Sequence, residues 1–472
     1  MTKFIGRVEE MEELNRLWDK TNEEGQLVII YGKRRIGKTE LVKEFIKDKT
    51  SAYYLATKTS ASDQLSTASQ TIFGDLKDEV VVNIKFENWR NFFDVLGARI
   101  AENDTPKIIV VDEFPYLAES DPAISSLFQY GWDERLKKTK TMLILMGSSI
   151  SMMYKHTLNY SAPLYGRRNS SMLIEPFTFQ EAKKFLDKGN FEKQFSLFAL
   201  VGGIPAYLSQ LDSSKSVDWN LVNILLRKNS FLRTEPELLI SEEFQEPRTY
   251  LTILKAIGLN QTKFGELSNN FSLDNTQLPF YLKTLLELRL IKKEVPITEK
   301  NPETSKKGSY SIGDNFLRFF FSFVLPNTSM IESEDLEMVV KLKTQTLKHL
   351  FAKAYEDTTT EFIKKAIKDE YLPSFYQFGR WWDSSTEIDL VCLNEPDDSI
   401  LFVETKWNDK PVDSKIYWEL VSKSESVKWG SNARKKYFAL VSKNGFTDEL
   451  KQLSKEQKIL LIQGDVVLQN YI

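Results

Sequence analysis

The chain has 472 residues, 42% of them apolar, and 63 Lys and Arg against 66 Asp and Glu give a net charge of −3. This length predicts about three domains with several cores, and the near-neutral charge excludes a global basic field, so nucleic-acid contact must rest on local patches. The single cysteine, Cys392, excludes a disulfide framework and a Cys-rich zinc module, and two histidines leave little for metal sites or a Ser-His-Asp triad.

The N-terminal residues 1–7 contain no apolar secretion segment. The most apolar stretch, 316–325, is short and carries Arg318. A stretch of this kind predicts a buried helix rather than a membrane span. We therefore expect a cytoplasmic protein without a membrane segment.

Residues 32–39 read Gly-Lys-Arg-Arg-Ile-Gly-Lys-Thr and lie between an apolar run, 27–31, and a helical pattern, 40–45. This strand-loop-helix setting is the one that a phosphate-binding loop requires. Its glycines let backbone N–H groups surround phosphates, and the helix adds the positive end of its dipole. The loop predicts binding of a nucleoside triphosphate through Gly32, Arg35, Ile36, Gly37, Lys38 and Thr39.

Two side chains of the loop have separate tasks. Lys38 reaches the β- and γ-phosphates, and the Thr39 hydroxyl ligates Mg²⁺. A second strand, 107–111, ends in Asp112 and Glu113. We expect Asp112 to hold Mg²⁺ through its water shell and Glu113 to orient or deprotonate the attacking water, which predicts ATP hydrolysis.

A third buried strand, 142–146, ends in Gly147-Ser148-Ser149, where a small polar side chain can contact the γ-phosphate. Further along, Arg167 and Arg168 offer guanidinium groups of the kind that stabilise charge in phosphoryl transfer. A surface arginine pair is an equal alternative, and the sequence does not choose which arginine acts.

Together these motifs resemble the archaeal-type ATPase family of the STAND/AAA-like P-loop class, over the first half of the chain. The motifs that carry the resemblance are Phe4–Arg7, the 32–39 loop, Asp112-Glu113, Gly147–Ser149, Leu164–Arg167 and Gly202–Pro205. The resemblance implies that Gly6 and Arg7 lie by the adenine and that Ser148 senses the γ-phosphate. It also implies that the turn ending at Pro205 reports the nucleotide state to the next domain.

The patterns of strand and helix predict an α/β ATPase core with a parallel sheet over residues 1–174. Residues 175–239 have helical periodicity and predict the lid of such an ATPase. Residues 240–325 predict a winged helix-turn-helix with helices at 250–257, 264–270 and 276–288 and strands at 290–295 and 310–312. Asp274 or Asn275 can cap its third helix, and Lys292, Lys293, Lys306 and Lys307 allow DNA contact as an alternative to a structural role.

Near the C-terminus, the strand patterns 387–393 and 400–406 flank a polar turn and predict a hairpin. Symmetric pairing about the turn places residue 393 opposite 400 and Asp389 opposite Glu404. Two-residue periodicity places Lys406 on the face of Glu404. Opposed carboxylates repel, so this placement favours a divalent cation between them, with Lys406 acting on water or phosphate.

This D…E-x-K arrangement resembles the PD-(D/E)xK nucleases. From about residue 344 to residue 472 the chain is similar to a restriction-endonuclease-like α/β domain, and we expect that domain to span 326–472. The resemblance implies Mg²⁺, or alternatively Mn²⁺, held by Asp389, Glu404 and the helix residue Glu356. Glu361, one turn further along, is the alternative to Glu356. A chance pattern or a member of the fold that has lost cleavage is the competing interpretation.

Two hypotheses follow from these motifs. In the first, the chain is an ATP-regulated nuclease acting on double-stranded DNA. In the second, it is a nucleotide switch or scaffold whose last domain binds nucleic acid or a partner without cutting. A motor or helicase ranks last, and homo-oligomerisation stays open because an arginine can come from a neighbouring subunit or from the same one.

Overall fold

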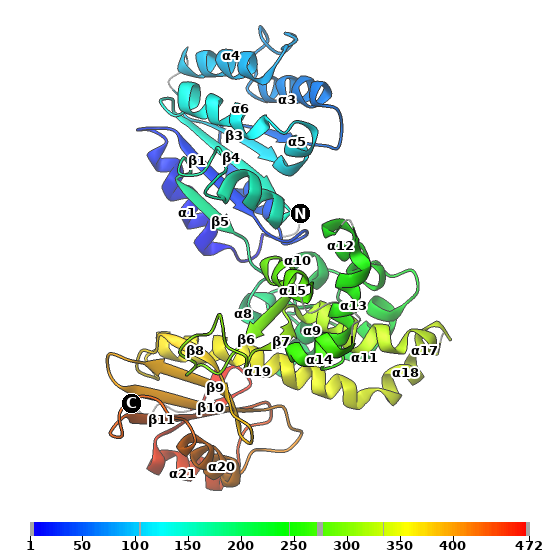
Figure 1. Cartoon of the computed structure of the whole chain (residues 1–472), viewed down its shortest axis with the longest axis vertical. Coiled ribbons are helices and arrows are strands. Elements are labelled where there is room, and N and C mark those ends of the chain that lie inside the picture. Colours follow the sequence, from blue (N-terminus) through cyan, green and yellow to red (C-terminus); the bar gives the residue numbers. More distant parts are fainter. Residues whose placement is uncertain (1–3, 103–104, 245, 271–276, 334, 469–472) are drawn as a thin grey trace. The chain divides into compact units, whose positions relative to one another are not determined.

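The computed structural model describes residues 4–102, 105–244, 246–270, 277–333 and 335–468. The chain divides into two compact units, which Figure 1 shows in sequence colours. The first unit contains residues 1–177 and Ile204–Ala206, and the second contains Thr178–Gly203 and residues 207–472. The domain borders expected inside the second unit stay predictions.

A five-stranded parallel sheet forms the centre of the first unit, in the order β2-β3-β4-β1-β5. Its strands are β1 (Gln26–Tyr31), β2 (Ser51–Leu55), β3 (Lys107–Asp112), β4 (Thr141–Gly147) and β5 (Ser170–Leu173). Strands β3 and β4 are buried along their whole length, as expected of parallel strands covered on both faces. The predicted parallel α/β core is confirmed.

Helices cover both faces of this sheet (Figure 1). They are α1 (Val8–Lys20), α2 (Lys38–Ile46), α3 (Ala61–Asp75), α4 (Trp89–Glu102), α5 (Phe114–Ser120), α6 (Ile124–Gly131), η1 (Trp132–Leu136), α7 (Ile150–Met153) and η2 (Tyr154–Leu158). Between α3, α4, α6 and the sheet lies an aromatic core in which the rings of Phe93 and Phe128 are 5.0 Å apart and edge to face. Burial of such large apolar groups is the main stabilising term for the unit.

The second unit begins with helices, as the periodicity of 175–239 predicts. They are α8 (Phe179–Ala182), α9 (Phe191–Val201), α10 (Pro205–Leu208, which starts in the first unit), α11 (Val217–Asn220), η3 (Leu221–Leu226) and α12 (Phe231–Glu243). The short helix α8 is stabilised by a capping box, in which Thr178 and Glu181 satisfy each other's backbone N–H groups.

Three helices and a two-stranded antiparallel hairpin follow. They are α13 (Pro247–Gly258), α14 (Phe264–Asn270), α15 (Leu278–Glu287), β6 (Ile291–Glu294) and β7 (Ser309–Ile312). The expected caps Asp274 and Asn275 lie outside the described residues. The apolar stretch 316–325 is a buried helical segment, as predicted, formed by α16 (Asn315–Phe319) and η4 (Phe320–Val324).

The C-terminal part is a mixed six-stranded sheet in the order β13-β12-β11-β10-β9-β8. Its strands are β8 (Gln377–Trp382), β9 (Glu387–Asn394), β10 (Ser399–Lys406), β11 (Lys435–Ser442), β12 (Ile459–Gln463) and β13 (Val466–Val467). The long helix α19 (Thr344–Lys368) packs on β9 and β10, whereas α20 (Ser414–Glu425) and α21 (Asp448–Gln457) share an apolar core with the sheet. The short helices η5 (Leu325–Asn327), α17 (Thr328–Glu332) and α18 (Leu336–Leu342) precede α19.

Within the described ranges, no helix is both long enough and apolar enough to cross a membrane.

Candidate nucleotide site and C-terminal acidic site

The loop of residues 32–39 joins β1 to α2 in the setting predicted from the sequence. Gly37, at φ 92°, stands at the start of α2, a left-handed conformation that suits glycine. A Cβ on Gly32 would lie only 2.5 Å from the carbonyl oxygen of Ile174, so no larger residue fits at this turn. Lys38 is 5% exposed, and its Nζ donates to the carbonyl oxygens of Gly32 and Lys33 at 3.0 and 3.1 Å.

Thr39 and Asp112 meet at the end of the loop. The Thr39 hydroxyl donates to Asp112 Oδ2 at 2.9 Å, and the backbone N–H of Glu113 donates to Asp112 Oδ1 at 2.8 Å. A facing hydroxyl and carboxylate fit Mg²⁺, which takes one or two protein oxygens and keeps several waters.

Tyr53 is a member of this site that the sequence reasoning missed. Its hydroxyl donates to Asp112 Oδ2 from β2, the strand next to β3. Burial, followed by the hydrogen bond to Asp112, raises the pKa of Tyr53 well above its ordinary range, so it stays a donor. The sequence could have suggested Tyr53 only if a strand at β2 had been placed beside β3. The register of β2 against β3, which brings Tyr53 to Asp112, cannot be read from the sequence.

Glu113 has a left-handed backbone, φ 53°, which turns its side chain away from β3. Its carboxylate accepts hydrogen bonds from the Ser148 hydroxyl and from the Ser148 backbone N–H, the latter at 3.1 Å. The structure therefore joins two residues that the sequence placed at the ends of different strands. In this state Ser148 holds Glu113.

Gly6 and Arg7 precede α1 with positive φ angles of 72° and 59°. The Arg7 guanidinium donates to the carbonyl oxygen of Ile36 at 2.9 Å and lies 4.4 Å from the centre of the Phe177 ring. Arg7 is thus packed against the phosphate-binding loop. Pro205 contacts the other side of the loop, since a Cβ on Gly37 would lie 3.7 Å from its Cγ.

The two candidate finger arginines have partners away from the loop. Arg167 Nε is 2.7 Å from Asp133 Oδ2, and its Nη1 donates to the Pro163 carbonyl at 2.8 Å. Arg168 Nη1 donates to the Thr157 carbonyl at 3.4 Å and its guanidinium lies 5.2 Å from the Tyr165 ring. Arg167 is therefore the more strongly held of the two in this state.

In the C-terminal sheet, the predicted hairpin register is confirmed. Leu393 pairs with Ile400, and the antiparallel ladder runs to Leu390 opposite Val403. The next side chain on β9 is Asp389, whose Oδ2 accepts from the Thr405 backbone N–H at 2.8 Å. Lys406 Nζ donates to Glu404 Oε1 at 2.6 Å, so these two side chains do share a face.

Asp389 is buried beside other carboxylates. Burial first, and then the negative charges of Glu404 and Glu356, raise its pKa to about 6. Burial lowers the pKa of Lys406, but the hydrogen bond and charge of Glu404, together with the charges of Asp389 and Glu356, raise it above the ordinary value. The carboxylates are close enough to disfavour one another's charge, which is the electrostatic condition under which a bound cation is stabilised.

Lys423 on α20 is a second residue that the sequence reasoning missed. Its Nζ is 3.1 and 3.0 Å from the two carboxylate oxygens of Glu404. Glu404 therefore binds two ammonium groups. Within the described ranges, no three His, Cys, Asp or Glu side chains are grouped so as to hold a metal.

Glu356 and Glu361 lie on α19 but have different surroundings. Glu356 pairs with Lys353 at 3.3 Å and is 3.9 Å from Arg380 Nη2. The Glu361 carboxylate instead accepts from the backbone N–H groups of Phe179 and Gln180, both at 3.0 Å, and so holds the start of α8. This geometry favours Glu356 as the acid near Asp389.

Comparison with known proteins gives separate matches for the N-terminal and the C-terminal part of the chain. Residues 4–211 match the family described as ATPase domain predominantly from Archaea. The chain is also 38% identical over 446 residues to uncharacterized protein MJECL04 of Methanocaldococcus jannaschii, covering 93% of this chain and 95% of that protein. The chain belongs to this archaeal ATPase family. In this ATPase, residues 320–419 match a second family, described as archaea bacterial proteins of unknown function.

The ATPase is 46% identical over 46 residues to uncharacterized ATP-binding protein MJ0423 of the same organism, covering 10% of this chain and 75% of that protein. Among solved structures, the Walker-type ATPase PABY2304 of Pyrococcus abyssi aligns with a TM-score of 0.50 and 19% identity, covering 67% of this chain and 96% of that one. The ORC2 protein of Aeropyrum pernix aligns with a TM-score of 0.46 and 14% identity, covering 71% and 97%. The likeness to PABY2304 supports a P-loop ATPase fold, and family membership supports nucleotide binding with Mg²⁺.

Proposed function

We propose that this ATPase uses its nucleotide state to regulate a DNA-directed, metal-dependent nuclease formed by its C-terminal sheet. The observation that carries the nuclease part is the meeting of Asp389, Glu404 and Lys406 at the end of one hairpin, with Glu356 close by. The regulatory role of the nucleotide is supported by the arrangement of the phosphate-binding loop with Asp112 and Glu113. We place the protein in the cytoplasm.

At the nucleotide site, each residue has a task that its position supports. Lys38 would bind the β- and γ-phosphates, and Thr39 and Asp112 would hold Mg²⁺, which supplies positive charge beside the γ-phosphate. Glu113 orients the attacking water once Ser148 turns from it to the γ-phosphate. A finger arginine from Arg167 or Arg168 must leave its present partners, in the same chain or in a neighbouring subunit.

At the acidic site, Asp389 and Glu404 would hold Mg²⁺ or Mn²⁺, which supplies an activated water and stabilises charge on the phosphate. Two carboxylates suffice for Mg²⁺, because that ion keeps several waters. Glu404 must then exchange at least one of its lysine partners for the ion. The freed Lys406 ammonium lies where it can stabilise the scissile phosphate or orient water.

The helices α13, α14 and α15 with the β6–β7 hairpin have the element order of a winged helix-turn-helix. We propose that this module contacts duplex DNA. Its support is the helix order together with the exposed Lys292 on β6. The overall charge of −3 makes such a local patch necessary for binding.

The segment Thr178–Gly203 offers a route between the two activities. It belongs to the second unit, although Phe177 and Ile204–Ala206 on either side of it belong to the first. Those flanks contact Arg7 and Gly37 at the nucleotide site. A nucleotide-dependent shift of the loop therefore acts on both ends of one segment.

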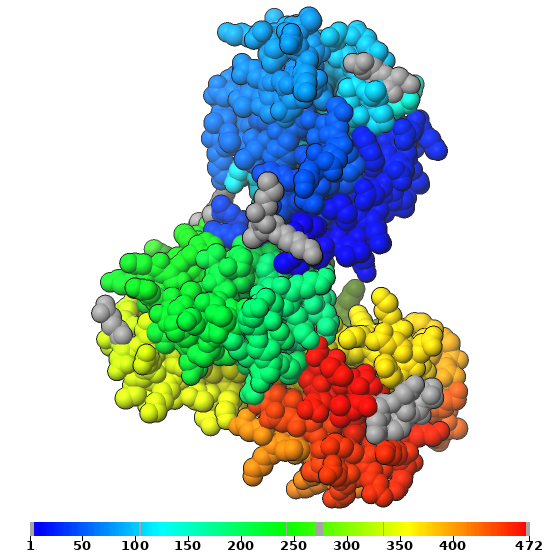
Figure 2. Space-filling view, turned by 180° about the vertical axis from the view of Figure 1, so that it is seen from behind, coloured from blue at the N-terminus to red at the C-terminus, as the bar shows by residue number. Residues whose placement is uncertain are grey.

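Inside the second unit, this segment packs on α19 and on Trp407, which follows β10. Figure 2 shows the red C-terminal residues against the green segment. The Phe195 ring lies 5.1 Å from both Tyr355 and Trp407. Trp407 directly follows Lys406, and Tyr355 precedes Glu356. A movement of the segment would therefore shift the residues next to both Lys406 and Glu356.

A nucleotide switch without cleavage is the second candidate. It is favoured by the engagement of Glu404 with Lys406 and Lys423, which already neutralises this carboxylate without a metal. In that case the C-terminal sheet binds nucleic acid or a protein partner.

Cleavage of supercoiled plasmid and of linear duplex DNA separates the two candidates. We expect cutting by the full chain with Mg²⁺ or Mn²⁺, none with a chelator, and a rate that changes when ATP is added. No cutting with either metal, with or without ATP, by a preparation that hydrolyses ATP would move the assignment to the switch.

Substitution of the two α19 glutamates assigns the third acid. We expect Glu356→Gln to lower the cleavage rate about tenfold or more while leaving thermal stability unchanged, because it disturbs the acidic site. We expect Glu361→Gln to keep cleavage but to destabilise the second unit by about 1 kcal/mol, because it weakens the cap on α8. Plasmid cutting and thermal melting measure the two effects, and the reverse pattern would make Glu361 the metal ligand.

A further inference from the structure

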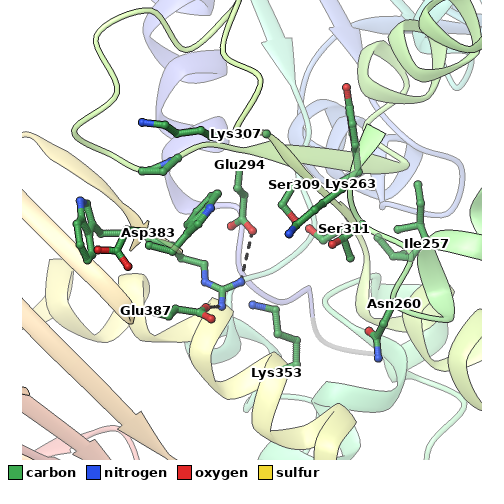
Figure 3. A pocket seen from close by; sticks show the side chains of 18 of the residues that line it. Ile257, Asn260, Lys263, Glu294, Lys307, Ser309, Ser311, Lys353, Asp383 and Glu387 are labelled. Carbon is green, nitrogen blue, oxygen red and sulfur yellow. Dashed lines mark hydrogen bonds and ion pairs between the residues drawn. The ribbon is translucent and has the colours of Figure 1, made fainter. Parts of the chain in front are cut away.

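A groove of about 1470 Å³ lies within the second unit, between the β6–β7 hairpin and the C-terminal sheet. One wall is formed by the end of α13, the loop between α13 and α14, and β7. The other is formed by β8, the turn after it, α19 and the segment after α20. Figure 3 shows Lys263 and Lys353 reaching toward each other across it. The groove is larger than the roughly 300–1,000 Å³ of a small-molecule pocket, which points to a polymer as its occupant.

The groove is basic in a chain that is slightly acidic overall. Seven Lys and Arg residues line it, against the three acids Glu294, Asp383 and Glu387. Two of those acids are neutralised inside the groove, since Arg380 pairs with both Glu294 and Glu387. The lining therefore carries a net positive charge, the electrostatic footprint of a phosphate backbone.

Three of the lining lysines, Lys263, Lys306 and Lys428, are exposed. Among the described side chains, no carboxylate lies within 4.0 Å of their ammonium groups. They come from both walls, Lys263 from the edge of α14, Lys306 from the loop before β7 and Lys428 from the segment after α20. Unpaired cations on two facing walls suit an anionic chain lying between them.

Both walls are tied to one another, so the groove is not a chance gap between loops. The backbone N–H of Ile297 donates to the Arg380 carbonyl at 2.9 Å, and Trp381 Nε1 donates to the Thr298 hydroxyl at 3.1 Å. Trp382, the next residue of β8, is half-buried and lines the groove. An aromatic ring on a basic groove wall is a platform on which an unstacked base can lie.

Arg380 links the groove to the acidic site. Its side chain lines the groove, its Nη2 lies 3.9 Å from Glu356, and its buried Nε has no hydrogen-bond partner among the described atoms. A phosphate bound by the Arg380 side chain in the groove would bring the nucleic-acid chain beside Glu356 and Asp389.

We propose that this groove binds a single strand of nucleic acid, with Lys263, Lys306 and Lys428 on its phosphates and Trp382 under a base. This proposal rests on the proposed function, because the bound strand would lead to the acidic site where cleavage is proposed. One turn of duplex DNA is about 34 Å long. A duplex segment of that length occupies more space than the groove of about 1470 Å³ provides. The winged module and the groove would then hold the duplex and one separated strand of the same substrate.

The test is binding of fluorescein-labelled oligothymidylate of about 20 nucleotides, longer than most single-strand sites, to the full chain. It is measured by anisotropy with a chelator present, so that binding is read without cleavage. We expect the triple variant Lys263→Glu, Lys306→Glu, Lys428→Glu to bind at least about tenfold more weakly. The slope of log affinity against log salt should fall by about 2, near 0.7 per lost contact.

The matched control is Lys228→Glu, Lys365→Glu, Lys455→Glu, which makes the same charge change at exposed positions of the second unit outside the groove. It should bind within about twofold of the wild type. Trp382→Ala should weaken binding about fivefold or more without changing the salt slope, because stacking is not ionic.

Equal loss in both triple variants, or wild-type affinity in the groove variant, would overturn the proposal, as would tighter binding of a blunt duplex of equal length. Plasmid cutting by the same preparations separates this result from the proposed function. If the strand binds through the groove but no DNA is cut, the groove assignment stands and the nuclease activity is contradicted.

Discussion

Replacement of Lys38 by alanine is expected to abolish ATP hydrolysis. Lys38 is buried at the centre of the loop, with its ammonium held by the carbonyls of Gly32 and Lys33. It is the cation nearest to where the β- and γ-phosphates lie in a loop of this kind. Loss of a positioned charge at a transferring phosphoryl group lowers the rate by about 100-fold or more.

Phosphate release and thermal melting with and without MgATP measure this prediction. Binding to the folded state raises stability by about 2.7 kcal/mol when ligand is at 100 times its dissociation constant, so the wild type should melt at a higher temperature with MgATP. The variant should lose most of that shift. Lys47→Ala, an exposed lysine at the end of the same helix, is the control and should behave as the wild type. Unchanged hydrolysis in Lys38→Ala would contradict the assignment of the nucleotide site.

Replacement of Asp389 by asparagine is expected to abolish metal-dependent cleavage while making the protein more stable. The variant keeps the shape of the side chain and an acceptor for the Thr405 N–H, but it removes one of two charged metal ligands. A metal ion contributes several kcal/mol of charge stabilisation, so we expect cutting to fall about 100-fold or more.

The stability gain follows from the raised pKa of Asp389, about 6 against an ordinary value of 3.8. The folded state binds this proton more tightly than the unfolded state, so without metal the wild type loses stability as the pH rises from about 4 to 6. Above that window its ionised, buried carboxylate costs about 3 kcal/mol, and Asp389→Asn removes this cost.

Urea unfolding with a chelator, at about pH 8 and again at about pH 5, measures this difference. The gain of the variant should be largest at the higher pH and should shrink toward the lower one. Asp397→Asn is the control, because Asp397 lies in the turn of the same hairpin and pairs at the surface with Lys435. A variant that still cuts, or that shows the same gain at both pH values, would remove Asp389 from the metal site.

Much of the nucleotide site was predictable because its residues are close in sequence or end apolar strands. The loop at 32–39 and the strand ending at Asp112 were placed from local patterns. In the structure the strand ends within one residue of its expected limit, and α2 begins two residues before the helical pattern expected at 40–45. Tyr53 was not predictable in this way. Its contact with Asp112 depends on β2 lying next to β3, and strand order is a property of the whole sheet.

The acidic site shows the same division. The hairpin register, and with it the approach of Asp389 to Glu404, followed from counting outward from one short turn. Lys423 and Glu356 come from helices on either side of that hairpin. Which helical residue reaches a strand depends on how the helix packs, and periodicity defines only the face that is buried.

The sequence by itself determined the phosphate-binding loop, the acid pair after β3, the parallel sheet and the C-terminal hairpin, because each depends on short-range spacing and on alternation of apolar residues. Only the tertiary structure decided that Glu361 holds α8, that residues 178–203 pack on α19, and that lysines from two modules face one groove. These features join residues far apart in the chain. Their contacts arise from packing and charge between elements, which no local pattern encodes.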